Sequence, residues 1–244
     1  MGMNGNIGKT IKLDIESKLN EIVKIYKKDT NGRHLSYVHC RNAFLKYRND
    51  KSKYDYLALH LFAYLGSWGM FRNSFFQQKD YTFLIPLIEI LCKNNYEPLA
   101  DSKVFGSDNE KAVELILNLA KEIKNYFIGK IYYKEDVEQK SVENVTDTLI
   151  SKIILGTYGC IVAYDNNVVA ALRERKLSTS LTKKSITQLI NIVNDNKEEI
   201  DSVINSLEDK TYTKMKILDM YFFYEGMKIK SNKNIIKPLY NNHI

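Results

Sequence analysis

Proline occurs only three times in this chain of 244 residues, at Pro86, Pro98 and Pro238. Proline is the residue that most strongly interrupts a helix, and about 5% of an average protein consists of it. A chain with so few prolines favours long uninterrupted helices over a turn-rich β-sandwich. We therefore predict an all-α fold.

The spacing of apolar residues supports this prediction. In residues 10–28 they recur every three or four positions with lysines on the opposite side, which is typical of an amphipathic helix. Residues 54–66 are apolar almost all round, so we expect a helix there that is buried on most of its surface. Further helical patterns cover residues 37–48, 82–93, 111–127, 145–155, 167–176, 183–207 and 213–229.

Composition excludes an intrinsically disordered chain, since 44% of the residues are hydrophobic and 11% are aromatic. No stretch approaches 18 apolar residues without a charge, and the first residues lack the apolar core of a secretory signal. We expect a soluble, cytoplasmic protein that does not enter the membrane. Cys40, Cys92 and Cys160 are widely spaced, and His39 and His60 have no partner at ligand spacing, so we expect reduced packing cysteines and neither a metal nor another cofactor.

The chain carries 36 Lys and Arg against 29 Asp and Glu, a formal net charge of +7. The excess is uneven: residues 1–56 and 171–244 are basic, whereas acidic residues outnumber basic ones in residues 57–170. If the two ends fold against one another they form a basic face, as in a protein that binds nucleic acid. A surplus of lysine is also common in proteins of AT-rich genomes, so charge alone leaves the partner open.

The most informative stretch is residues 145–175, VTDTLISKIILGTYGCIVAYDNNVVAALRER. A helical pattern stops at Gly159, a brief extended run follows, and Asp165 stands directly before a second helix that opens with Asn166 and Asn167. An aspartate there is typical of a helix cap, which would hold the side chain and lower its pKa. A fixed carboxylate could equally stabilise the cation that develops on a sugar when an N-glycosidic bond is hydrolysed. Both interpretations of Asp165 stay open.

This arrangement resembles the active-site segment of the helix-hairpin-helix DNA glycosylases. Tyr158-Gly159, Asp165 and Val168 stand where that family has an aromatic-glycine pair, a catalytic aspartate and an apolar helix residue. The resemblance implies a two-lobed helical bundle with a cleft between its lobes, Asp165 as the catalytic residue, and double-stranded DNA as the partner of a monomer. We expect residues 1–244 to form a single globular unit with approximate lobes at 1–106, joined by part of the C-terminal region, and 107–244.

The chain also departs from the family pattern. The family's glycine-containing hairpin, which approaches a DNA phosphate, corresponds to VENVTDT here and has no glycine. Thr148 stands where bifunctional members have a lysine that forms a Schiff base, so the resemblance implies a monofunctional enzyme. The residues expected to contact DNA are Lys140, Thr146, Thr148, Lys152, Asn166 and Asn167.

A second stretch, ALHLFAYLGSWGMFRNSFFQQKDY at residues 58–81, resembles the ALHLxxYLxSWGMxRxS pattern of a bacterial family. Its characterised relative is an anti-phage DNA glycosylase that removes α-glucosylated 5-hydroxymethylcytosine. Trp68 stands beside glycines, where its ring could stack on an extruded base, and the polar residues after it could read a base or a sugar. The alternative is that Trp68 is an anchor of the hydrophobic core and that the polar residues after it cap helices. The expected base pocket consists of Trp68, Arg72, Gln77, Gln78, Tyr158 and Tyr164, with Asn73 as a further donor.

Together these features predict a monofunctional DNA glycosylase that removes a flipped-out modified base from phage DNA, leaving abasic sites that block replication. The alternative is a non-catalytic helical protein, either a nucleic-acid-binding protein or a regulatory protein, with Asp165 as a helix cap. A helical toxin ribonuclease is a third and weaker interpretation.

Overall fold

The structure is a computed structural model that describes residues 10–72, 74–100, 109–134, 137–207, 209 and 211–240. It is predominantly helical, as predicted, with one small antiparallel sheet in the part of the chain that it describes. The α-helices are α1 (Ile15–Lys28), α2 (Leu35–Tyr47), α3 (Tyr54–Ser67), α4 (Ile85–Leu91), α6 (Asn109–Phe127), α7 (Asp147–Thr157), α8 (Asn166–Glu174), α9 (Lys183–Asp195), α10 (Lys197–Ser206) and α11 (Lys214–Tyr240). Four 3₁₀ helices lie between them, η1 (Lys51–Lys53), η2 (Phe75–Gln78), η3 (Tyr81–Leu84) and η4 (Asn94–Ala100), and the strands are β1 (Ile131–Lys134) and β2 (Glu138–Ser141).

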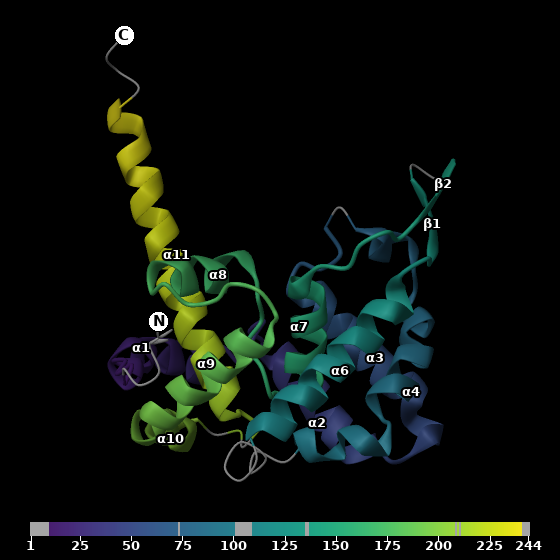
Figure 1. Cartoon of the computed structure of the whole chain (residues 1–244), viewed down its shortest axis with the longest axis horizontal. Helices are drawn as coiled ribbons and strands as arrows, with labels where there is room; N and C mark the ends of the chain where they lie inside the picture. Colours follow the sequence, from purple (N-terminus) through teal and green to yellow (C-terminus); the bar gives the residue numbers. More distant parts are fainter. Residues whose placement is uncertain are drawn as a thin grey trace, which may run out of the picture.

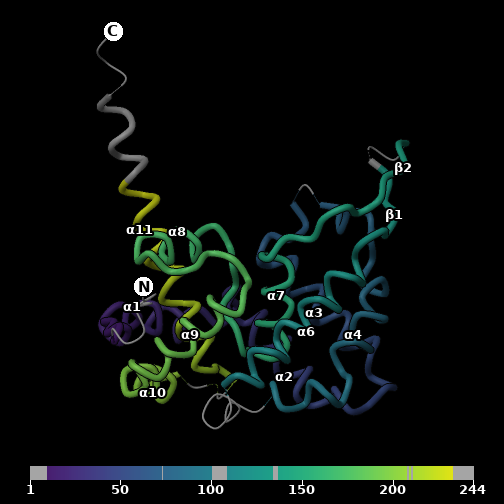
Figure 2. Tube along the Cα trace, viewed as in Figure 1, coloured from purple at the N-terminus to yellow at the C-terminus, as the bar shows by residue number. Residues whose placement is uncertain are grey.

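The helices form two groups that lie side by side (Figures 1 and 2). One group contains α2, α3, α4, α6 and α7, and the other contains α1, α8, α9, α10 and α11. Contacts between α6 and α9 join the groups. α6 and α7 pack with the early helices while α1 packs against α10 and α11, and the approximate lobes at 1–106 and 107–244 stay a prediction.

The position of α1 follows from its apolar face. Ile15, Leu19 and Val23 are spaced by four residues and are buried, so one stripe of the helix faces the rest of the molecule. Just before α1, the Leu13 backbone N–H donates to Asn196 Oδ1 at 2.7 Å. This bond fixes the start of the chain to the junction between α9 and α10.

The β1–β2 hairpin lies at the outer end of the first group (Figure 1), in a segment where no regular pattern was predicted. Its register pairs Ile131 with Ser141 and Lys134 with Glu138. Tyr132 points inward toward Phe75, with ring centroids 6.3 Å apart. The hairpin is thus joined to an aromatic cluster that also includes Phe76, Phe83 and Phe127.

Two further expectations concern the described residues. Cys40, Cys92 and Cys160 are buried free thiols, as predicted. None of the described helices is both long enough and apolar enough to cross a bilayer.

Candidate functional site

The backbone between α7 and α8 places Asp165. α7 ends at Thr157, and Gly159 adopts a φ of 63°, which confirms the predicted glycine stop. Residues 160–164 then cross the core as a buried irregular segment rather than a strand. We call residues 160–164 the crossing segment.

Side chains from two helices hold the crossing segment. On α7, Thr148 donates to the Tyr164 carbonyl at 2.7 Å, and Ser151 Oγ accepts from the Tyr164 backbone N–H at 2.9 Å. On α11, Asp219 Oδ1 accepts from the Ala163 backbone N–H at 2.8 Å. Because the backbone is held from both sides, Asp165 enters α8 at a defined position.

The two carboxylate oxygens of Asp165 have different surroundings. Oδ1 accepts hydrogen bonds from the backbone N–H groups of Asn167 and Val168, at 2.9 and 3.1 Å, and so caps α8. Oδ2 lies 3.8 Å from the Lys152 ammonium. Capping therefore uses one oxygen and leaves the other facing a charged side chain, so the two interpretations of this residue are compatible.

The pKa of the Asp165 carboxyl is raised above its ordinary value. Burial is the main cause, and the negative charge of Asp219 acts in the same direction. The N-terminal N–H groups of α8 and the Lys152 ammonium oppose this rise without cancelling it. The hydrogen bonds of the cap act to lower this pKa, as expected, but burial outweighs them and the net shift is upward.

Lys152 is the nearest cation to Asp165, and its side chain is only 7% exposed. Its ammonium also donates to the Trp68 carbonyl at 3.0 Å. Burial lowers the pKa of Lys152, although Asp165 and Asp219 act in the opposite direction. This lysine is part of the interior of the site, and its expected contact with DNA stays a prediction.

A second buried ion pair supports this arrangement. Lys216 donates to Asp219 Oδ2 at 2.8 Å, and the two side chains are 6% and 7% exposed. Burial disfavours the charged lysine, but the Asp219 carboxylate more than compensates and raises the pKa of Lys216. Asp219 thus positions the crossing segment with one oxygen and neutralises a buried cation with the other.

Asp165 and Lys152 line a pocket of about 530 Å³, here called the Asp165 pocket. Its walls come from Arg33 in the segment just before α2, from the segment after α3 (Trp68 to Arg72), from α7, from the start of α8, and from Phe223 and Lys230 on α11. Four cationic side chains and one carboxylate line it: Arg33, Arg72, Lys152, Lys230 and Asp165. The pocket is therefore suited to an anionic group with one position for a developing cation.

Trp68 forms a fixed wall of the Asp165 pocket. Its indole N–H donates to Ser36 Oγ at 3.1 Å, and the Arg33 guanidinium lies 4.5 Å from its ring centroid. The ammonium groups of Lys216 and Lys152 lie 5.2 and 5.7 Å from the same centroid. A stacking partner on the Arg33 side would have to displace that exposed arginine.

Most of the residues predicted to contact DNA or base lie at this pocket or beside it. Trp68, Arg72, Thr146, Thr148, Lys152, Asn166 and Asn167 line it, and Asn167 Oδ1 accepts from Lys230 Nζ at 2.8 Å. Lys140 lines a neighbouring pocket on the hairpin side and pairs with Glu138.

Four predicted base-pocket residues do not line the Asp165 pocket. Tyr158 is buried and donates to the Leu91 carbonyl, and the buried Tyr164 hydroxyl bonds Ser185 Oγ at 2.6 Å. Gln78 uses its amide on both backbone groups of Tyr133, and Gln77 is exposed on η2. The side chains of Tyr158, Tyr164 and Gln78 anchor the core or the hairpin instead, and Gln77 lies on the surface away from the pocket. Asn73 lies outside the described residues.

Six residues of the pocket wall were not predicted from the sequence: Arg33, Ser67, Gly69, Met70, Phe223 and Lys230. The helical pattern of α11 contains Phe223 and Lys230 but does not show which face meets α8. Gly226 explains that contact, since a Cβ there would come within 1.9 Å of the Asn167 carbonyl oxygen. Arg33 and His39 have the Arg-x4-6-His spacing of helical toxin ribonucleases. His39 is exposed and does not line the pocket that contains Arg33.

Within the described ranges, no group of three or more His, Cys, Asp or Glu side chains is placed to hold a metal ion. Comparisons of the chain with protein-family models, with curated proteins and with solved structures find no match. The case for a function therefore depends on the chemistry of the Asp165 pocket.

Proposed function

We propose that this protein is a monofunctional DNA glycosylase that hydrolyses the N-glycosidic bond of a flipped-out modified base. The observation that carries the proposal is the Asp165 carboxylate, which has one oxygen in a helix cap and the other in a pocket lined by four cations. Hydrolysis of an N-glycosidic bond develops positive charge on the sugar, and a fixed carboxylate stabilises that charge. The cations around it suit the phosphates that flank the same sugar.

Asp165 has the properties of a group that assists such a reaction. Its cap to α8 removes most of its freedom to rotate, so it needs little reorganisation as charge develops. Burial in the pocket strengthens its interaction with a developing cation, because fewer water dipoles screen the charge. The raised pKa of Asp165 also suits a group that accepts a proton from the attacking water.

Lys152 has a separate part in this proposal. Its ammonium favours the ionised form of Asp165 and so opposes the effect of burial, and its bond to the Trp68 carbonyl ties α7 to the pocket wall. A neutral Lys152 amine would be a nucleophile for the aldehyde of an abasic site. The proposed enzyme is monofunctional because Thr148 stands where bifunctional members of the family have the lysine that forms the Schiff base.

Flipping a base out of the duplex costs a few kcal/mol, which phosphate contacts must offset. Arg33 and Arg72 are exposed at the pocket and can reach phosphates without being desolvated. A pocket of about 530 Å³ lies within the range that holds ligands of nucleotide size. The proposed substrate is α-glucosyl-5-hydroxymethylcytosine in phage DNA, on the strength of the resemblance of residues 58–81, with replication blocked at the abasic sites.

Base release tests the proposal. Duplex DNA with and without glucosylated hydroxymethylcytosine is incubated with the protein, abasic sites are cleaved with alkali, and fragments are separated on a gel. Asp165→Asn keeps a side chain that can cap α8 and should abolish cleavage. Asp80→Asn is the matched control, since Asp80 caps η3 in the same way but lines neither pocket described here, and it should retain full activity. No fragments with wild type, or equal fragments with Asp165→Asn, would contradict the assignment.

Borohydride trapping tests the monofunctional part. Reduction in the presence of substrate DNA should give no covalent protein–DNA adduct. An adduct that disappears in Lys152→Arg would show instead that this lysine attacks the sugar.

A non-catalytic nucleic-acid-binding protein is the second candidate. The complete cap that Asp165 Oδ1 makes with α8 favours it, since that contact alone explains an aspartate at this position. This candidate predicts DNA binding without base release and equal DNA affinity for wild type and Asp165→Asn.

A further inference from the structure

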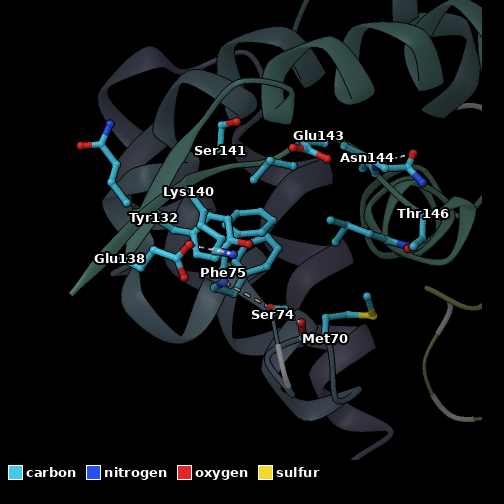
Figure 3. A pocket seen from close by; sticks show the side chains of 15 residues that line it. Met70, Ser74, Phe75, Tyr132, Glu138, Lys140, Ser141, Glu143, Asn144 and Thr146 are labelled. Atoms are coloured by element: carbon cyan, nitrogen blue, oxygen red, sulfur yellow. Dashed lines mark hydrogen bonds and ion pairs between the residues drawn. The ribbon is translucent and has the colours of Figure 1, made fainter. Parts of the chain in front are cut away.

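A second pocket, the hairpin pocket, adjoins the Asp165 pocket. It has a volume of about 740 Å³ and is lined by the β2 strand, the segment that leads into α7, and the region around η2. Met70 and Thr146 line both pockets, so the two share a wall. Figure 3 shows Glu143 and Asn144 on one side of the hairpin pocket and Met70 and Ser74 on the other.

The two pockets differ in charge. Cations outnumber carboxylates four to one in the Asp165 pocket, whereas Glu138 and Glu143 outnumber the single cation Lys140 in the hairpin pocket. Lys140 is itself paired with Glu138 at 3.2 Å. Because a phosphate would meet an excess of negative charge there, the hairpin pocket is unsuited to the DNA strand.

The hairpin pocket also has polar groups with no partner in the described part of the chain. Neither the Glu143 carboxylate nor the Tyr132 hydroxyl forms a hydrogen bond or ion pair there. Tyr132 and Phe75 contribute half-buried aromatic rings, with centroids 6.3 Å apart. Hydrogen-bond acceptors and donors beside aromatic rings suit a ligand with many hydroxyl groups and an apolar ring face.

We propose that the hairpin pocket binds a neutral, polyhydroxylated substituent of the base, a hexose, while the Asp165 pocket holds the nucleotide that carries it. Glu143 and Tyr132 bond the hydroxyl groups of the hexose, and Phe75 packs against it. This assignment rests on the proposed function and adds which residues select the modified base. The excess of carboxylates makes a hexose a better occupant than a neighbouring nucleotide.

Two duplexes that are identical except for one base test the assignment. One carries 5-hydroxymethylcytosine and the other carries its glucosylated form. Fluorescence anisotropy measures the Kd of the full chain for each, and single-turnover base release is followed in parallel. Wild type should bind the glucosylated duplex about tenfold more tightly, since a hydrogen bond to a charged group is worth roughly that factor or more.

Glu143→Ala and Tyr132→Phe should each reduce this preference severalfold and leave the Kd for the hydroxymethyl duplex unchanged. The matched controls are Glu114→Ala, at an exposed position on α6, and Tyr133→Phe, on the next residue of β1, and both should keep the preference. Tyr132→Phe removes only a hydroxyl that bonds no described residue, so it should fold normally.

The outcomes are distinct. A wild-type protein with equal Kd for both duplexes, or variants that weaken both equally, would overturn the hexose assignment even where bases are released. A preference in binding that Glu143→Ala removes would support the assignment even if no base were released, and the proposed glycosylase would then be the part that fails.

Discussion

Replacement of Lys152 by methionine should destabilise the protein more at neutral pH than in acid. The Lys152 ammonium lies 3.8 Å from Asp165 Oδ2, and the two side chains are 7% and 14% exposed. At an effective dielectric constant of about 20, unit charges at this distance attract by about 4 kcal/mol, and breaking a buried pair costs about 3–5 kcal/mol. Methionine fills a similar space but leaves Asp165 without its cation. We expect the free energy of unfolding to fall by about 3 kcal/mol near neutral pH.

The dependence on pH follows from the raised pKa of Asp165. A carboxyl whose pKa is higher in the folded than in the unfolded protein stabilises the fold while it is protonated, and this contribution is lost as pH rises through its folded pKa. Removal of Lys152 raises the pKa of Asp165 further. The destabilisation by Lys152→Met should therefore be small in acid and grow as the pH rises. In a base-release assay, the acidic limb of the rate profile should move to higher pH.

Urea unfolding over a range of pH measures the effect in wild type, Lys152→Met, Asp165→Asn and the double variant. The double variant has neither charge, so its stability should return toward wild type, with a coupling energy between the two sites. Lys183→Met is the control: Lys183 bonds Glu110 at 2.7 Å, but both side chains are exposed, and no measurable change is expected. A loss that is independent of pH, or an equal loss for the control, would refute the reasoning.

Three further predictions concern the surroundings of the site. Asp219→Asn removes a charge that raises the pKa of Asp165. The acidic limb of the pH profile of the base-release rate should therefore move to lower pH, opposite to the shift expected for Lys152→Met, and a shift to higher pH would contradict this. Gly156→Ala should lower the free energy of unfolding by about 1–3 kcal/mol, because a Cβ there would come within 2.4 Å of the Tyr64 ring. Urea titrations measure this loss, and unchanged stability would show that the Tyr64 ring moves aside without cost. Tyr158→Phe should lower the free energy of unfolding by about 1 kcal/mol, because it removes the hydrogen bond to the buried Leu91 carbonyl. Base release at saturating DNA should keep the wild-type rate, and a slower rate would show that Tyr158 contributes to the base pocket.

Much of the local structure could be predicted from the order of residues. The apolar stripe of α1, the glycine stop after α7 and the cap position of Asp165 all depend on neighbours within a few residues. Scarce proline left the helices uninterrupted, and the structure is predominantly helical. The β1–β2 hairpin was not predicted, because its strands have four residues each and Ile131 and Tyr133 remain exposed.

The site itself could be predicted only in part. Trp68 and Arg72 come together with Asp165 in one pocket, although Asp165 lies far from them in the chain. Tyr158 and Tyr164 both stand shortly before Asp165 in the sequence, but their side chains turn into the core, where the hydroxyl groups bond the Leu91 carbonyl and Ser185. Sequence position indicates that such a residue is near a site and leaves open which side of the backbone it occupies.

The sequence by itself determined that the chain is predominantly helical and that an aspartate starts α8, because periodicity and capping are local interactions. Only the tertiary structure decided what that aspartate faces. The crossing segment brings Asp165 back to Lys152 of α7, and the packing of α11 on α8 places Lys230 and Phe223 at the same pocket. Burial of these charges together, which depends on the packing of helices distant in sequence, gives Asp165 its raised pKa and Lys152 its lowered one.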